Sequence, residues 1–212
     1  MPRGLIHGLD PAKIAANLAR AREKAGEGVE ILVASKYVPI EEMGALAEAG
    51  VTLVGENRQQ DLAAKRERWG DAFEWDFVGN LQSRKVKLLL PCCRLIHSVA
   101  SQSALEQVAK HGDSETEVLV EVNVAGEEGK GGIDPMGLEA FIAGAAPARV
   151  SGLMTMPPFS QDPQASRPHF ARLAQLADEH GLSRLSMGTS QDWEVAVEEG
   201  ATTVRLGTAL FV

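Results

Sequence analysis

The sequence predicts an α/β fold, a (β/α)₈ TIM barrel that forms a single domain, 1–212, with an extra N-terminal helix. Short apolar runs alternate eight times with longer helical patterns, and the connections between them are short. An open doubly wound sheet is the alternative, but the first strand is not followed by the GxGxxG turn that favours dinucleotide binding. At 212 residues the chain is close to minimal for a barrel.

The elements of the first half follow from apolar runs and helix start signals. Asp10 as N-cap and Pro11 at the first helical position begin a helix that runs to about Ala25, ahead of the repeating units. Pro39 opens the helix after the first strand. The predicted strands are 30–36, 51–54, 74–79 and 94–99, and the predicted helices are 39–49, 58–68, 81–90 and 102–111.

The second half repeats the unit. The strand 117–124 is the clearest, because its valines occupy one face and Leu119, Glu121 and Asn123 the other. Two prolines at 157–158 end the sixth strand, and Ser190 is the expected N-cap of the last predicted helix. The predicted strands are 117–124, 149–156, 182–188 and 202–207, and the predicted helices are 135–146, 164–180 and 191–199.

The composition excludes several classes of function. A net charge of -8 disfavours binding to phosphodiester backbones. The only two cysteines, Cys92 and Cys93, are adjacent, which suits neither a structural disulfide nor a zinc site, so we expect reduced thiols. No apolar run approaches the length of a membrane span, and residues 1–9 lack the core of a signal peptide. The expected compartment is the cytoplasm.

A lysine ends the first predicted strand. Period-two geometry places Lys36 on the face that points into the barrel, opposite Tyr37. A buried ammonium is costly unless it is paired, neutralised or covalently bound, and buried lysines are therefore often Schiff-base or general-base residues. The alternative is a strand-end lysine that reaches solvent. The residue alone does not decide between them.

Polar residues collect where the other predicted strands end. Asn57 follows the second strand, Asn123 lies near the end of the fifth, and the turns at the ends of the seventh and eighth strands contain glycines and hydroxyl groups. Such turns suit a phosphate, because backbone N–H groups approach an anion closely there. We expect Arg205 to point inward and to add a charge-assisted contact. Each of these residues could also simply end a strand, cap a helix or pair with a carboxylate.

A Schiff-base-capable lysine and a phosphate-binding turn on one barrel together suggest an aldehyde that carries a phosphate. Pyridoxal 5'-phosphate (PLP) fits that description. A Schiff-base lyase acting on a phosphorylated sugar or aldehyde would use the same residues without a cofactor. A scaffold barrel that binds a partner protein through the polar segments 126–132 and 81–87 is a third interpretation, although an ordinary loop and a solvated helix face explain those segments as well.

The sequence resembles the pyridoxal phosphate homeostasis protein family, which shares the barrel of the alanine racemase N-terminal domain, and the resemblance runs nearly end to end. The motifs are LVASK at 32–36, GEN at 55–57, WDFVG at 75–79, LQSRK at 81–85, IHS at 96–98, VNV at 122–124, GLMTMPP at 152–158, LSMG at 185–188 and VRLGTA at 204–209. The resemblance implies that Lys36 forms the aldimine with PLP and that Asn57 lies close to the cofactor. The residues it implies around the phosphate are Ser186, Arg205, Gly207 and Thr208.

Three departures from the family pattern stand out. Asp76 occupies a position where the family usually has histidine, which puts in doubt any role of that histidine. The residues 189–193 read TSQDW, where the family has a second methionine followed by Ser-Asp-Asp. The chain also stops at Val212, so the usual short final helix is expected to be missing or trimmed.

The resemblance implies a PLP carrier in intracellular PLP homeostasis, without robust catalysis. A racemase or decarboxylase needs a second acid or base across the cofactor, and the only tyrosine, Tyr37, is expected on the wrong strand face. The five histidines are scattered, and His97, near the end of the fourth strand, is the one to consider. The expected partners are PLP and PLP-dependent apoenzymes, with no nucleic acid and no membrane, and the expected state is a monomer.

Overall fold

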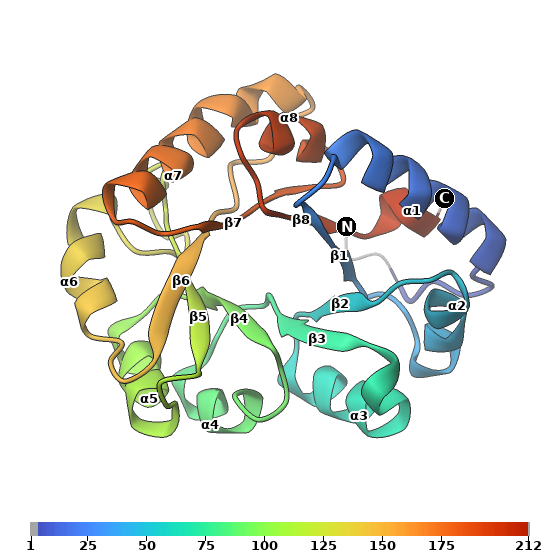
Figure 1. Ribbon diagram of the computed structural model, residues 1–212, viewed down its shortest axis with the longest axis horizontal. Coiled ribbons are helices and arrows are strands. Elements are labelled where there is room, and N and C mark those ends of the chain that lie inside the picture. The colour runs from blue at the N-terminus through green and yellow to red at the C-terminus, as the bar shows by residue number, and fades with distance from the viewer. Residues whose placement is uncertain (1–3, 212) are drawn as a thin grey trace.

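The computed structural model describes residues 4–211, and these form a closed barrel of eight parallel strands in sequence order. Helices surround the strands in a ring (Figure 1). The strands are β1 Glu30–Ala34, β2 Leu53–Glu56, β3 Glu74–Phe77, β4 Leu95–Val99, β5 Glu117–Glu121, β6 Arg149–Met154, β7 Arg184–Thr189 and β8 Thr203–Leu206. The predicted (β/α)₈ fold is confirmed.

The helices match the predicted helical segments but are often shorter. The α-helices are α1 Pro11–Ala25, α2 Met43–Glu48, α3 Gln59–Trp69, α4 Val86–Leu89, α5 Gln102–His111, α6 Leu138–Ala143, α7 Arg167–Glu179, α8 Trp193–Glu198 and α9 Thr208–Phe211. Short 3₁₀ turns, at Ile40–Glu42, Ser83–Lys85, Pro135–Gly137 and Pro163–Ser166, supply the first turn of α2, α4, α6 and α7. Proline and polar residues favour this tighter opening of a helix.

The two ends of the described chain meet beside the seam of the barrel. Strand β1 pairs with β8 through four residues in parallel register, from Glu30 opposite Thr203 to Val33 opposite Leu206. Helix α1, capped by the Asp10 carboxylate as predicted, lies against the last helix, α9, and the Asn17 side chain donates to the Leu210 carbonyl at 3.0 Å. The final helix is not missing: α9 is a short helix over 208–211, and Val212 lies outside the described residues.

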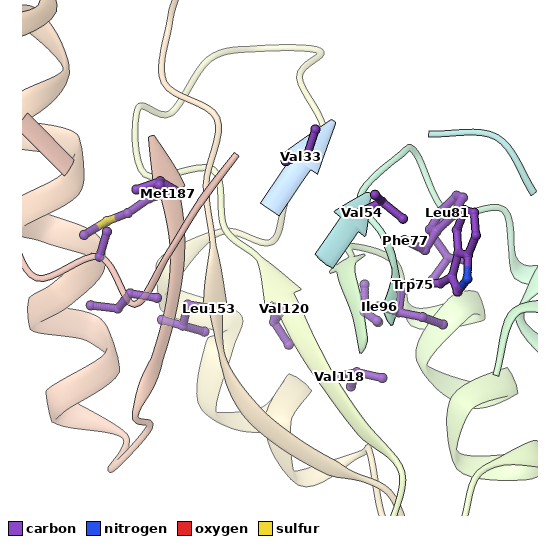
Figure 2. Close-up of a cluster of buried hydrophobic side chains, with 14 of the residues drawn as sticks. Val33, Val54, Trp75, Phe77, Leu81, Ile96, Val118, Val120, Leu153 and Met187 are labelled. Atoms are coloured by element: carbon purple, nitrogen blue, oxygen red, sulfur yellow. The ribbon is translucent and has the colours of Figure 1, made fainter. Parts of the chain in front are cut away.

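The main hydrophobic core lies between the outer face of the barrel and the helices. The outward residues of the strands, among them Val33, Val54, Ile96 and Val118, pack with the apolar faces of the helices in one cluster (Figure 2). Burial of this many aliphatic side chains supplies the dominant stabilising free energy of the fold. A much smaller apolar cluster fills part of the barrel interior and consists of Leu95, Leu119 and Met154. Leu32 and Leu53 are also buried but belong to neither cluster, and several polar residues, among them His97, Ser186 and Arg205, are buried as well.

Both cysteines are free, as predicted, and each is partly buried. Within residues 4–211, no helix combines the length and the hydropathy needed to cross a membrane.

Candidate functional site

Lys36 lies beyond the first strand rather than in it. Strand β1 ends at Ala34, and residues 36 and 37 form a turn in which Val38 N donates to the Ser35 carbonyl at 2.8 Å. The period-two alternation stops at that point, so the prediction of a buried Lys36 is wrong: the side chain is exposed. The placement of Tyr37 on the opposite face is also wrong, because Lys36 Nζ lies 5.1 Å from the centroid of its ring.

A buried ion-pair cluster, formed by Ser35, Glu56 and Lys65, lies next to the turn at residues 36 and 37, here called the lysine turn. Lys65 Nζ donates to the Ser35 carbonyl at 2.7 Å and to the Glu56 carboxylate, and the Ser35 hydroxyl donates to the same carboxylate at 2.8 Å. Lys65 is 6% exposed and the other two are fully buried. The cluster joins β1, β2 and α3 immediately before Lys36 and Asn57, and so fixes where both residues leave their strands.

Sequence reasoning missed this cluster. The signal was available on α3, where Lys65 follows Leu62 by three residues and shares its buried face. A lysine on the apolar face of a helix needs a carboxylate partner, and Glu56, at the end of a neighbouring strand, was the candidate.

A second group of polar side chains, here called the interior network, consists of the buried residues Asp76, His97, Ser186 and Arg205 and the exposed residue Arg94. Arg94 donates to both carboxylate oxygens of Asp76, at 3.1 and 2.8 Å. The His97 ring lies 3.1 Å from Asp76 through Nε2 and 2.8 Å from the Ser186 hydroxyl through Nδ1. Arg205 donates to that hydroxyl at 2.7 Å. The predicted inward direction of Arg205 is therefore confirmed, and His97, the histidine singled out from the sequence, lies in the same network.

Arg205 is a buried cation without an ion pair among residues 4–211. Its guanidinium donates to the carbonyl groups of Ser186 and Thr155, at 2.7 and 2.9 Å, and the residue is 6% exposed. Burial lowers its pKa to about 10, and the charges of Glu121 and Asp192 offset only part of that effect. A buried cation in this state favours an anionic or electron-rich ligand near it.

The turns after β7 and β8 meet above Arg205. Ser190 Oγ accepts from Gly207 N at 3.2 Å, and Asp192 accepts from Thr189 N at 2.7 Å. Gly188 has φ +87° and an added Cβ would lie 2.6 Å from Ala196 Cβ, so only glycine fits there. The N-cap of α8 is Asp192 instead of the predicted Ser190, which faces the other turn.

The structure separates the residues predicted around the phosphate into two levels. Gly207 and Thr208 form the turn itself, beside Ser190, which the resemblance did not assign to the phosphate. Ser186 lies on β7, four residues before Ser190, and is buried against Arg205. Gly207 also faces β1: an added Cβ would lie 3.6 Å from Ala34 Cβ. The lysine turn and the glycine turn are thus neighbours across the seam of the barrel.

The two predicted asparagines differ. The Asn57 side chain is partly buried, at the end of β2. The Asn123 side chain bonds both to N and to O of Glu127, at 3.2 and 2.9 Å, and so closes the loop after β5. Glu121, at the end of β5, lies near Arg205 and Lys130; burial raises the pKa of its carboxyl, against the effect of these two cations. Among the described residues, no group of three or more His, Cys, Asp or Glu is placed to hold a metal ion.

The pKa of His97 gives a testable pH dependence of stability. Burial lowers this pKa, while Asp76 opposes the shift. Above about pH 6.5 the His97 ring is neutral in both the folded and the unfolded protein. Below that pH the ring binds a proton more readily in the unfolded chain than in the folded protein, so the free energy of unfolding falls as the pH falls. We expect the free energy of unfolding to drop by up to about 1.4 kcal/mol per pH unit from this residue between pH 6.5 and 5.

Urea denaturation at several pH values checks this expectation. His97→Gln should show a shallower loss of stability between pH 6.5 and 5 than the unsubstituted protein, whereas His111→Gln, at the exposed end of α5, should not. Equal slopes in the unsubstituted protein and in His97→Gln would contradict a neutral buried ring.

Comparisons of the sequence and the structure with known proteins identify relatives of this chain. Residues 9–212 match the family described as alanine racemase, N-terminal domain. The pyridoxal phosphate homeostasis protein of Aquifex aeolicus is 40% identical over 216 residues, covering 94% of this chain and 95% of the relative. The structure of PipY from Synechococcus elongatus with PLP bound has 30% identity and a TM-score of 0.80, covering 94% of this chain and 100% of that one. Alanine racemase from Corynebacterium glutamicum, 16% identical with a TM-score of 0.77 over 98% of this chain and 63% of its own, shares the fold.

Proposed function

The chain belongs to the family of pyridoxal phosphate homeostasis proteins, and we propose that it binds PLP reversibly, attaches it to Lys36, and takes part in intracellular PLP homeostasis without robust catalysis. When bound, PLP supplies an aldehyde that reacts with a primary amine. The proposed partners are PLP itself and apoenzymes that accept it. Relatives of this chain are named pyridoxal phosphate homeostasis proteins, and we propose the same role here.

One observation carries the proposal: an accessible amine and an anion-binding turn are neighbours on adjacent strands. Lys36 follows β1 and Gly207 follows β8, and these strands pair along their length. Lys36 forms no ion pair among the described residues, so its amine is available. The N–H and hydroxyl groups of the turn at Gly207 and Thr208 are suited to a phosphate.

The interior residues also fit PLP. Arg205 presents a buried positive charge below the glycine turn, and no carboxylate among the described residues neutralises it by direct contact. Asn57 leaves β2 beside the lysine turn, within reach of a ligand that spans the mouth of the barrel. We propose these two residues, with Lys36, Ser186, Gly207 and Thr208, as the PLP-binding set, and we add Ser190 because its hydroxyl lies 3.2 Å from Gly207 N.

The absence of robust catalysis is proposed from the surroundings of Lys36. Carbanion chemistry needs a second proton donor or acceptor across the cofactor from the lysine. Tyr37 lies on the same side as Lys36, because the amine sits 5.1 Å from its ring centroid, and so it does not provide that group. The exposure of Lys36 suits exchange of the aldehyde with solvent or with a partner protein.

Visible absorption of the purified protein, before and after borohydride, tests the proposal. We expect a yellow band that borohydride removes, and peptide mass analysis should place the reduced adduct on Lys36. Lys36→Ala should lose the band and the adduct completely, while Lys87→Ala, on the exposed face of α4, should keep both. The absence of a band after incubation with PLP would refute the proposal and favour a lyase that uses Lys36 without a cofactor.

Assays with amino acids separate a carrier from an enzyme. The PLP-loaded protein should not turn over amino acids at a rate above that of free PLP, and it should restore activity to an apoenzyme at a rate set by release of PLP. Turnover that disappears in Lys36→Ala would overturn the carrier assignment.

A further inference from the structure

The interior network has a defined direction of hydrogen-bond donation. At one end, Arg205 can only donate, and the Ser186 hydroxyl accepts from it at 2.7 Å. At the other end, the Asp76 carboxylate can only accept while it is ionised. Burial raises the pKa of this carboxyl, but the hydrogen bonds from His97 and Arg94 outweigh burial and hold it below its ordinary value. The network therefore has a donor at one end and an anion at the other.

The ring of His97 must satisfy both ends. Its Nε2 lies 3.1 Å from the carboxylate oxygen of Asp76, which has no proton to give, so Nε2 carries the proton. Burial lowers the pKa of His97, so the ring is neutral and Nδ1 is an acceptor. The Ser186 hydroxyl, 2.8 Å away, then donates its proton to Nδ1. All three hydrogen bonds consequently run from Arg205 toward Asp76.

This direction matters to Arg205. A serine proton that points at His97 leaves the oxygen lone pairs facing the guanidinium, which is the favourable arrangement. If His97 carried its proton on Nδ1 instead, the ring would donate to Ser186. The serine proton would then lack an acceptor among the described residues and would lie close to a buried cation. Arg205 would be less well held.

We propose that Asp76 is a positioning residue for ligand binding, which fixes His97 as the Nε2–H tautomer and thereby aims the Ser186 hydroxyl so that it holds Arg205. Asp76 belongs to β3, His97 to β4, Ser186 to β7 and Arg205 to β8, so the effect crosses the barrel. Asp76 does not contact the site at the mouth of the barrel and acts only through the other residues. The inference rests on the proposed role of Arg205 in PLP binding.

The tautomer can be measured without any ligand. Nitrogen-15 NMR of the protein distinguishes protonated from unprotonated ring nitrogens, and the resonances that disappear in His97→Gln identify His97. We expect an unprotonated Nδ1 in the unsubstituted protein. In Asp76→Asn, the amide offers a single acceptor oxygen to His97 and Arg94 together, and we expect the Nδ1–H tautomer to become populated. Arg94→Gln removes the neighbour of Asp76 but leaves its carboxylate, and should keep the original tautomer.

A double-mutant cycle tests the path to the ligand. Asp76→Asn and Ser186→Ala should each weaken PLP binding by about tenfold, because each releases a hydrogen-bonded charged group. If Asp76 acts through Ser186, the double variant should bind PLP as weakly as Ser186→Ala alone. Independent structural damage would instead multiply the two effects to about a hundredfold.

The outcomes separate this inference from the proposed function. A protonated Nδ1 in the unsubstituted protein would overturn the inference whether or not any variant folds. So would multiplicative effects in the cycle, or unchanged PLP affinity in Asp76→Asn, even while the unsubstituted protein binds PLP at Lys36. Failure of the unsubstituted protein to bind PLP would refute the proposed function and the inference's effect on binding together, and the tautomer would still report the direction of the network.

Discussion

Replacing Lys65 with methionine is expected to lower the free energy of unfolding by about 3–5 kcal/mol, because it leaves a buried carboxylate without its cation. The Glu56 side chain is fully buried. Among residues 4–211, Lys65 Nζ is the only cationic group that pairs with it. The same amine holds the Ser35 carbonyl at 2.7 Å, so the lysine turn loses an anchor as well. Urea denaturation measures the loss, and covalent retention of PLP on Lys36 measures the displacement of the turn.

The double substitution Glu56→Gln with Lys65→Met is the matched control. It removes both charges, so it should recover most of the stability that the single substitution loses. Lys87→Met, on an exposed helix face, should stay within about 0.5 kcal/mol of the unsubstituted protein. A single Lys65→Met variant with a loss below about 1 kcal/mol would show that the ion pair does not hold this part of the fold.

Gly79→Ala is expected to cost about 3 kcal/mol or more and to weaken PLP binding, because two backbone segments touch at this glycine. An added Cβ would lie 1.9 Å from the carbonyl oxygen of Asn57 and 2.5 Å from its carbonyl carbon. Neither atom belongs to a flexible side chain, so the backbone at Asn57 must shift. Thermal denaturation and PLP titration measure the two consequences.

Gly137→Ala provides the comparison. The nearest atom to an added Cβ there is a side-chain carbon of Ile133 at 4.0 Å, so the substitution should change neither stability nor PLP affinity appreciably. If Gly79→Ala behaved in the same way, the contact between residue 79 and Asn57 would not constrain the site.

The fold could be predicted from the sequence because its signals are local. The alternation along 117–124 correctly separated the valines of β5 from Leu119, and the helix 102–111 was predicted with its observed bounds. The first turns of α2, α4, α6 and α7 are 3₁₀, so these predicted helices were too long by the α-helical definition.

The site was harder to predict because its contacts join distant segments. Period-two alternation predicted that Lys36 points into the barrel. The strand ends two residues earlier, at Ala34, and in the turn that follows the Lys36 side chain is exposed to solvent. Alternation also cannot say how far each strand is staggered against the next. The stagger of β7 against β8 brings Ser190 to Gly207, and the closure of the barrel brings Ser186 on β7 to His97 on β4.

Asp76 illustrates the same limit. The resemblance made it a departure whose effect the sequence left open. Its partners are Arg94, immediately before β4, and His97, in β4, and their closeness to Asp76 depends on the pairing of Asp76 with Leu95. A carboxylate between an arginine and a neutral histidine is chemically consistent, but only the three-dimensional register shows that both are present.

The pairing of β1 with β8 has a consequence for how the protein folds. Its first partners, Glu30 and Thr203, are separated by most of the chain, so closing this pairing costs loop entropy, and we expect it to form late in folding. A molecule held by Lys36 on one side and Gly207 on the other would cross-link that last junction. Occupancy would then slow local opening between the first and last strands, and amide hydrogen exchange at Ile31 and Val204 would report the ligand before global unfolding does.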